Sequence, residues 1–237
     1  MIEKAYLDLF RAATMLSSDR PSDKVNAVYL HGLSEGMVES AGIFKKAVDM
    51  VTFGSMGRQA EFIAFNGSRG EGMGEQNRPG AAWPGSEYYI KELTTELTSH
   101  HSLANTPNIL VPTGPGFHTR SETDELVLTA KERGWKSVAI MSVAWHSVRS
   151  MSCVVASMYA LGYQFKAYFV TPNSTNWWLP MKGSQGIADT IPFAEVLAEI
   201  DRILKYWSRG EGDGWRKGYG APPEMLFDYL HKREEIE

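Results

Sequence analysis

The sequence predicts an α/β fold in which a mainly parallel sheet of about five strands is covered by helices on both faces. Short β-prone runs alternate with amphipathic stretches along most of the chain, which is typical of such sheets. The 237 residues favour one large domain over two small ones. A content of 43% hydrophobic and 22% charged residues excludes wholesale disorder, a collagen-like chain and a coiled coil.

Each element has its own signal in the sequence. Apolar residues at helical spacing from Ala5 to Leu16 predict a first helix, which the polar run 17–21 ends. After it, β-prone runs and helical patterns follow one another, separated by glycine-containing or polar loops. The expected strands are 26–31, 61–65, 108–111, 136–143 and 165–170, and the expected helices are 37–51, 86–97, 119–133, 147–161 and 192–207.

The chain divides into three segments. Residues 1–24 form the N-terminal helix, 25–207 the α/β domain, and 208–237 a glycine-rich segment that leads to a C-terminal helical extension or a charged tail. Within the domain, the loops 66–85 and 173–186 are long, and such loops in compact domains are usually functional. We expect the first of them to be a lid or a substrate loop.

Charge and cysteine content bound the function. The chain has 24 basic and 28 acidic residues, so it lacks the positive field that non-specific nucleic-acid binding needs. Cys153 is the only cysteine, which excludes an intramolecular disulfide. The N-terminus has no secretory pattern, and no apolar run approaches the roughly 18 residues of a membrane span. We therefore expect a cytoplasmic protein without a nucleic-acid partner.

Ligands of open α/β sheets bind outside the carboxyl ends of the strands, so the loops there hold the candidate residues. The loop after the first strand reads Gly32-Leu33-Ser34-Glu35-Gly36 and matches the G-x-S-x-G pattern of a serine nucleophile. Only a helix precedes it, whereas that nucleophile normally lies deeper in the sheet. The favoured interpretation is that the glycines let the backbone approach a ligand, with Ser34 as a helix cap.

The helix after the third strand opens with a second candidate group. Thr119 and Glu122 have the spacing of a capping box, and this interpretation has about even weight with ligand binding. Capping does not explain Arg120, because a guanidinium in the first turn opposes the helix dipole unless an anion or an acidic neighbour is present. Arg120 is therefore a candidate ligand for an anion.

The loop after the fourth strand contains the third group. His146 and Arg149 follow Ser142 at the start of a helix, where a histidine can transfer protons and an arginine can bind phosphate or carboxylate. The alternative is a buried structural His146 and an Arg149 paired with a surface acid. A metal site could be assembled from acidic and imidazole side chains of these loops, but they show no dedicated metal-ligand spacing, so no metal is predicted; the candidates are His31, Glu35, Glu87, His118 and Glu122.

These motifs together resemble the ElyC/SanA/YdcF family over about residues 25–207. The likeness lies in the glycine-containing loops after the first two strands and in the acidic residue that opens the next helix. Its most specific part is His118-Thr119-Arg120-Ser121-Glu122 followed by Trp145-His146-Ser147-Val148-Arg149. The resemblance implies a Rossmann-like three-layer sandwich, a nucleotide-type ligand such as S-adenosylmethionine, and an association with envelope and lipid-carrier metabolism. The pocket positions that it implies are Gly32, Asn66, Gly67, Glu87, Thr119, Glu122, Ser142, His146 and Arg149.

Three functional hypotheses follow. The first is an enzyme, a hydrolase or a group transferase, acting on a phosphorylated or nucleotide-like small molecule. In it His146 moves a proton, and Glu87 or Glu122 orients ribose, water or the nucleophile. The second is a non-catalytic ligand sensor with a protein partner. The third is a serine hydrolase that uses Ser34.

Overall fold

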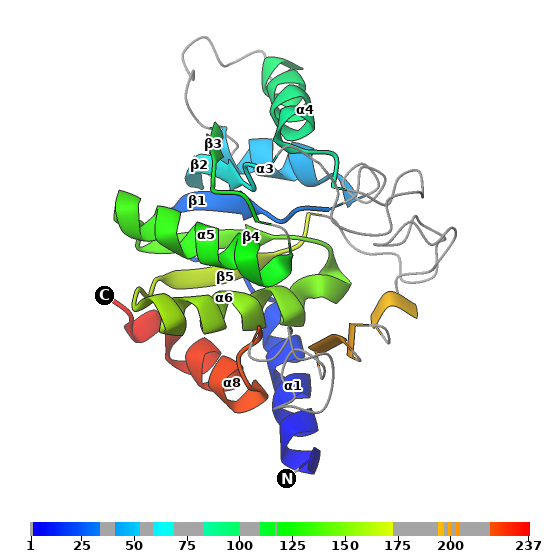
Figure 1. Cartoon of the computed structure of the whole chain (residues 1–237), viewed down its shortest axis with the longest axis vertical. Helices are drawn as coiled ribbons and strands as arrows, with labels where there is room; N and C mark the ends of the chain where they lie inside the picture. Colours follow the sequence, from blue (N-terminus) through cyan, green and yellow to red (C-terminus); the bar gives the residue numbers. More distant parts are fainter. Residues whose placement is uncertain are drawn as a thin grey trace.

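The chain forms a three-layer α/β sandwich in a computed structural model (Figure 1). The structure describes residues 2–33, 41–52, 59–68, 83–99, 110–116, 118–172 and 219–237, together with 194–196, 199–200 and 202–203. None of the helices in this described part is long and apolar enough to cross a membrane.

The central layer is a parallel sheet of five strands in the order β3-β2-β1-β4-β5. The chain builds β1, β2 and β3 outward in one direction and then returns to place β4 on the other side of β1. This arrangement confirms the predicted Rossmann-like fold class. The strands are β1 (Val25–Leu30), β2 (Ala60–Phe65), β3 (Leu110–Pro112), β4 (Ser137–Met141) and β5 (Lys166–Val170).

Helices cover both faces of this sheet because side chains alternate along each strand. In β1, Val28 and Leu30 belong to the apolar cluster that includes α3 (Ile43–Val51) and α4 (Ser86–Ser99). Ala27 and Tyr29 belong to the cluster that includes α5 (Thr119–Arg133) and α6 (Ser147–Leu161). Strands buried on both faces in this way explain the nearly continuous apolar runs in the sequence.

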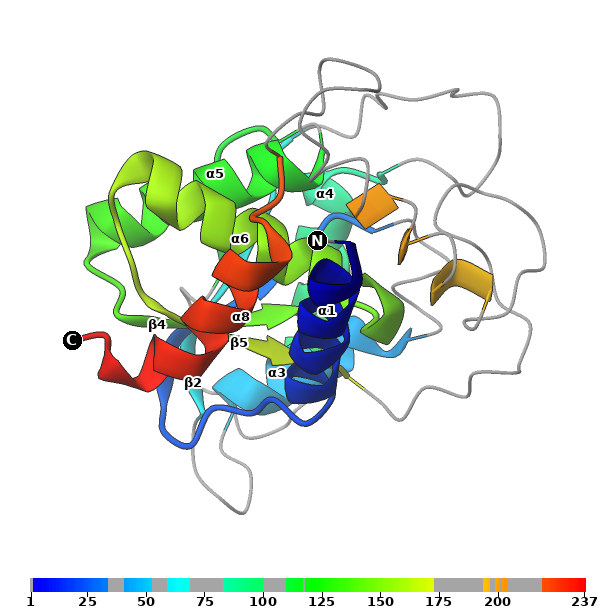
Figure 2. The ribbon, with the colours of Figure 1, turned by 90° about the horizontal axis from the view of Figure 1, so that it is seen from below.

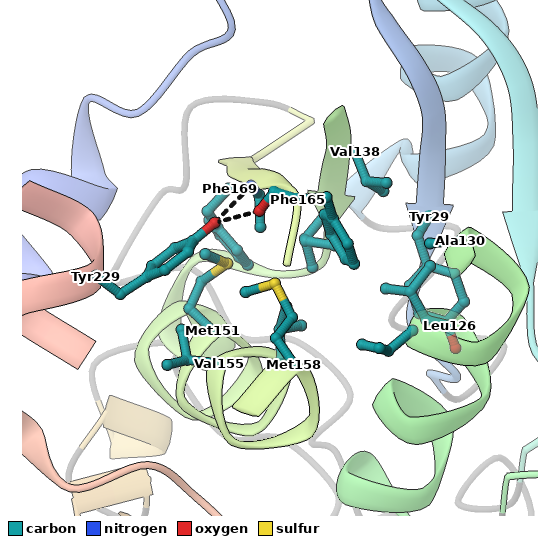
Figure 3. Close-up of a cluster of buried hydrophobic side chains, with 14 of the residues drawn as sticks. Tyr29, Leu126, Ala130, Val138, Met151, Val155, Met158, Phe165, Phe169 and Tyr229 are labelled. Carbon is teal, nitrogen blue, oxygen red and sulfur yellow. Dashed lines mark hydrogen bonds between the residues drawn. The ribbon is translucent and has the colours of Figure 1, made fainter. Parts of the chain in front are cut away.

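The second cluster also holds the helices near the two ends of the described chain. α1 (Ile2–Ser17) and α8 (Pro223–Lys232) pack against each other and against α6 (Figure 2). In the close-up of this cluster, side chains of β1, β5 and α6 interdigitate (Figure 3). The predicted C-terminal helical extension is therefore present as α8, and its apolar side completes the core beside β5.

Side chains from outside the sheet cover the edge of β5. The Tyr229 hydroxyl donates to Phe165 O (2.9 Å) and accepts from Ala167 N (2.7 Å), as Figure 3 shows in part. Asp19 Oδ2 accepts from Phe169 N (2.7 Å), and Arg233 donates both to Asp19 and to Ala167 O. Backbone groups that an edge strand would leave unpaired are thus satisfied without another strand.

Several predicted segments differ from the structure or lie outside its described part. The helix expected at 37–51 is described as α3 from Ile43, and the expected helix 192–207 is described at seven positions, all helical. The loop 173–186 and most of 66–85 lie outside the described residues, as does the glycine-rich 208–218. β3 is described from Leu110 to Pro112, and residues 108–109 of the predicted strand lie outside the described part.

Candidate functional site

The strand order reverses between β1 and β4, and the loops after these two strands meet there. In open α/β sheets this topological switch point forms the ligand crevice. His31 follows β1 directly, and its backbone N–H donates to Met141 O of β4 (3.2 Å). Ser142 follows β4. The two loops that carry candidate residues therefore start side by side in the middle of the sheet.

A buried carboxylate ties three elements together at this point. Glu122 of α5 accepts from Asn66 Nδ2 at Oε1 (3.2 Å), and its Oε2 lies 3.0 Å from Nδ1 of His31. His31 is fully buried and Asn66 and Glu122 are nearly so. A carboxylate in such a place must be paired, and here both oxygens have partners. The sequence-predicted residues Asn66 and Glu122 are thus brought together.

The Asn66 side chain also fixes the loops after β2 and β3. Its Nδ2 donates to Gly116 O (2.6 Å), and its Oδ1 accepts from the backbone N–H groups of Gly116 (3.1 Å) and Ser68 (2.9 Å). A Cβ at Gly116 would lie 2.7 Å from atoms of Glu122. Glycine therefore lets the loop after β3 approach the start of α5. A Cβ at Gly67 would likewise overlap the carbonyl oxygen of Thr113.

Gly32 allows a second close approach. A Cβ there would overlap Oε1 of Glu122 and lie 3.3 Å from the ring of Trp83. Next to it, the Tyr89 hydroxyl donates to His31 O (3.0 Å) and accepts from Leu33 N (3.2 Å). Burial raises the pKa of Tyr89 well above its ordinary value, so this hydroxyl keeps its proton and can donate. The Tyr89 hydroxyl therefore fixes the backbone after β1 at two points, the carbonyl of His31 and the N–H of Leu33.

His146 lies on the other side of the switch point. It ends the short 3-10 turn Ala144–His146, which leads into α6, and its Nδ1 lies 3.1 Å from Ser142 Oγ. The rings of His31 and His146 are adjacent, with centroids 5.4 Å apart. Burial lowers the pKa of His146 well below its ordinary value of 6.5, and the nearby charges of Arg149, His31 and Arg202 lower it further. Its imidazole is therefore neutral at neutral pH.

Arg149 is paired with a buried acid. Its Nε and Nη2 donate to the two oxygens of Glu199 (2.5 and 3.0 Å), and its Nη1 donates to Thr119 Oγ1 (2.7 Å). Arg202 donates to the same carboxylate (2.5 Å). Arg149 thus pairs with an acid, as the alternative interpretation predicted. That acid is not at the surface, because Glu199 is only 2% exposed. A phosphate that binds Arg149 has to compete with this bidentate pair.

The start of α5 differs from the predicted cap. His118 is the N-cap, and it exchanges hydrogen bonds with Ser121 instead of Thr119 exchanging them with Glu122. The box is shifted because the helix begins one residue earlier than the Thr119–Glu122 spacing requires. Arg120 has the acidic neighbour that its position called for, since its Nε donates to Asp124 (2.8 Å).

Among the described residues, four buried side-chain atoms have no hydrogen-bond partner, and two of them belong to the adjacent rings of His31 and His146. The four atoms are Nε2 of His31, Nε2 of His146, Nε1 of Trp83 and Oγ of Ser150. Trp83 packs over Gly32, and Ser150 lies one helical turn after His146. A buried polar atom without a partner costs about 1 to 3 kcal/mol, so two such atoms on adjacent histidine rings point to a polar ligand.

The remaining predicted residues lie elsewhere. Glu87 is exposed in the first turn of α4, and Ser34 lies outside the described residues. Sequence reasoning weighed His31 only as a metal ligand and did not single out Trp83, Tyr89 or Glu199. The signal for His31 was its place directly after a buried strand. In the described part of the chain, no group of three or more His, Cys, Asp or Glu side chains is arranged to hold a metal ion.

Comparison of the chain with protein-family models, with curated proteins and with solved structures found no match. The resemblance to the ElyC/SanA/YdcF family therefore stays a prediction from the motifs. The structure itself shows a Rossmann-like fold and, at the switch point, the buried contacts of His31 with Glu122 and His146.

Proposed function

We propose that the chain is an enzyme, a hydrolase or a group transferase, that binds a phosphorylated or nucleotide-like small molecule at the carboxyl ends of β1 and β4. The observation that carries the proposal is the pair of adjacent buried imidazoles of His31 and His146 at the switch point, each with an Nε2 atom that has no partner among the described residues. In this proposal S-adenosylmethionine and other nucleotides are candidate ligands, as the motif resemblance implies.

His146 is the proton-transferring residue of the proposal. A neutral imidazole can accept a proton, and the lowered pKa of His146 keeps it neutral. Its Nδ1 is engaged by Ser142, whereas Nε2 has no partner among the described residues. Ser142 therefore orients the ring, and Nε2 is the reactive atom.

The start of α6 supports an anionic ligand. His146 precedes this helix and its side chain makes no capping hydrogen bond, while the Ser147 N–H donates to Ala144 O. The other N–H groups of the first turn and the helix dipole favour negative charge. Arg149 and Thr119 lie at the same end and are hydrogen-bonded to each other, and the Arg149 charge is paired with Glu199. A phosphate at this end of α6 would contact backbone N–H groups and would compete with Glu199 for Arg149.

The test is a thermal-shift panel of inorganic phosphate, pyrophosphate, AMP, sugar phosphates and S-adenosylmethionine. A ligand at about 100 times its dissociation constant stabilises by about 2.7 kcal/mol, which raises the melting temperature of a domain of this size by about 5 to 10 °C. We expect one ligand class to give such a shift, and His146→Asn to weaken it. His231→Asn, an exposed histidine on α8, is the matched control and should leave the shift unchanged.

A flat panel would contradict the phosphate or nucleotide proposal. Equal weakening by His146→Asn and His231→Asn would contradict the role of His146. The sensor and the Ser34 hydrolase stay predictions from the sequence, because no described contact bears on them.

A further inference from the structure

Two buried histidines meet at the switch point, and the proposed function uses only one of them. We infer that His31 is a second acid–base residue of the same site, positioned by Glu122 and working as a pair with His146. This inference rests on the proposed function and adds a residue to its chemistry. It starts from the contacts of the His31 ring.

The two nitrogens of the His31 ring have different surroundings. Nδ1 lies 3.0 Å from Oε2 of Glu122, while Nε2 is buried without a partner among the described residues. An ionised carboxylate only accepts hydrogen bonds, so it fixes the hydrogen of His31 on Nδ1. The Nε2 atom then has a lone pair in the neutral ring and a proton in the imidazolium.

Glu122 is itself held in the orientation that this role needs. Asn66 donates to its other oxygen, and Gly32 and Gly116 leave room for it where any Cβ would collide. The arrangement of a carboxylate, an imidazole and a free second nitrogen is the one that orients a histidine for proton transfer. Glu122 therefore acts as a positioning residue through His31 rather than on the ligand.

Packing alone does not account for a histidine at this position. The ring contacts Tyr29 edge to face, with centroids 5.4 Å apart, and an apolar aromatic side chain would make the same contact. His31 instead leaves its Nε2 atom without a hydrogen-bond partner among the described residues, and a buried polar atom without a partner destabilises the fold. That atom belongs to a ring adjacent to His146, whose own Nε2 is equally without a partner.

The pair supplies the two proton transfers that hydrolysis or group transfer at a phosphate ester requires. His146 Nε2 accepts the proton of the attacking hydroxyl or water while its oxygen forms a bond to phosphorus. The imidazolium of His31 gives its Nε2 proton to the oxygen that leaves as the other phosphorus–oxygen bond breaks. His146 gains one proton and His31 loses one, so the total charge of the two histidines is the same before and after the reaction.

The experiment is nitrogen-resolved NMR of the protein with ¹⁵N-labelled histidine, which reports the protonation of each ring nitrogen. In the wild-type protein we expect the neutral His31 ring to carry its hydrogen on Nδ1, and the protonated ring to carry the second one on Nε2, which is the proton that it donates. In Glu122→Gln the amide can donate to Nδ1, so the hydrogen of the neutral ring should move to Nε2. Glu132→Gln, an exposed position on the same helix, is the control and should leave the His31 signals unchanged.

Inorganic phosphate and AMP are then added to separate samples. Movement of the Nε2 signals of both His31 and His146 supports the pair. Movement of His146 alone overturns the inference about His31 and leaves the proposed function standing. Movement of neither signal with either probe contradicts the anion site and, with it, the inference. A wild-type His31 whose neutral ring carries its hydrogen on Nε2 also overturns the inference.

Discussion

The pKa of His146 links a single residue to the stability of the whole fold. Burial lowers the pKa of His146 in the folded state, and the charges of Arg149, His31 and Arg202 lower it further. The Ser142 hydroxyl, which lies next to Nδ1 of His146, is uncharged. The unfolded chain has no such environment and binds the proton at the ordinary value of 6.5. Below that pH the unfolded state therefore holds more protons than the folded state, and stability falls as the pH falls.

The prediction at this scale compares the wild-type protein with His146→Gln, which cannot be protonated. As the pH decreases from about 7.5 to about 5, the wild-type protein should lose up to about 1.4 kcal/mol of unfolding free energy per pH unit more than the variant. Urea denaturation at several pH values measures the difference. Parallel pH profiles for the two proteins would contradict it. His118, whose pKa burial also lowers, is present in both and cancels.

At the scale of elements, the apolar periodicity predicted the strands and most helices, because burial on both faces of the sheet leaves a clear pattern. The helix cap was predicted wrongly for a physical reason. Both Thr119–Glu122 and His118–Ser121 have residues three apart that can exchange hydrogen bonds, and the choice depends on where the chain turns into the helix. Glu122 is then available for His31, which a capping role would have prevented.

The capping interaction gives the element-scale prediction. Ser121→Ala removes the hydroxyl that accepts from His118 N and leaves one end of α5 less well satisfied. The variant should lose about 0.5 to 2 kcal/mol of unfolding free energy. Chemical denaturation measures it, with the exposed Glu132→Ala near the other end of α5 as the control. Equal losses in both variants would mean that the cap does not stabilise the helix.

At the scale of the whole molecule, part of the site followed from the sequence and part did not. The place of His146 after an apolar run put it at the carboxyl edge of the sheet, and the family resemblance implied Asn66 and Ser142 there. The pairing of His31 with Glu122 could not be predicted, because these residues are 91 positions apart and meet only through the strand order. The same is true of Arg149 and Glu199, which come from separate helices.

The covered edge of β5 gives the prediction for the whole molecule. Tyr229→Phe keeps the packing of the ring but leaves Ala167 N and Phe165 O without the hydroxyl. Buried backbone groups without partners cost about 1 to 3 kcal/mol, so the variant should unfold at lower denaturant concentration. Tyr159→Phe, on the exposed face of α6, is the matched control. A Tyr229→Phe protein as stable as this control would contradict the role of the hydroxyl.

The edge of β5 also has a consequence for the order in which the chain is completed during synthesis. Tyr229 is 62 positions beyond the strand residue whose N–H it accepts, and Arg233 bonds Asp19 across 214 positions. A nascent chain that has already released β5 from the ribosome therefore still shows an open strand edge until residues 229–233 emerge. During that interval the edge is a place where another extended segment can pair, and the emergence of Tyr229 and Arg233 closes it.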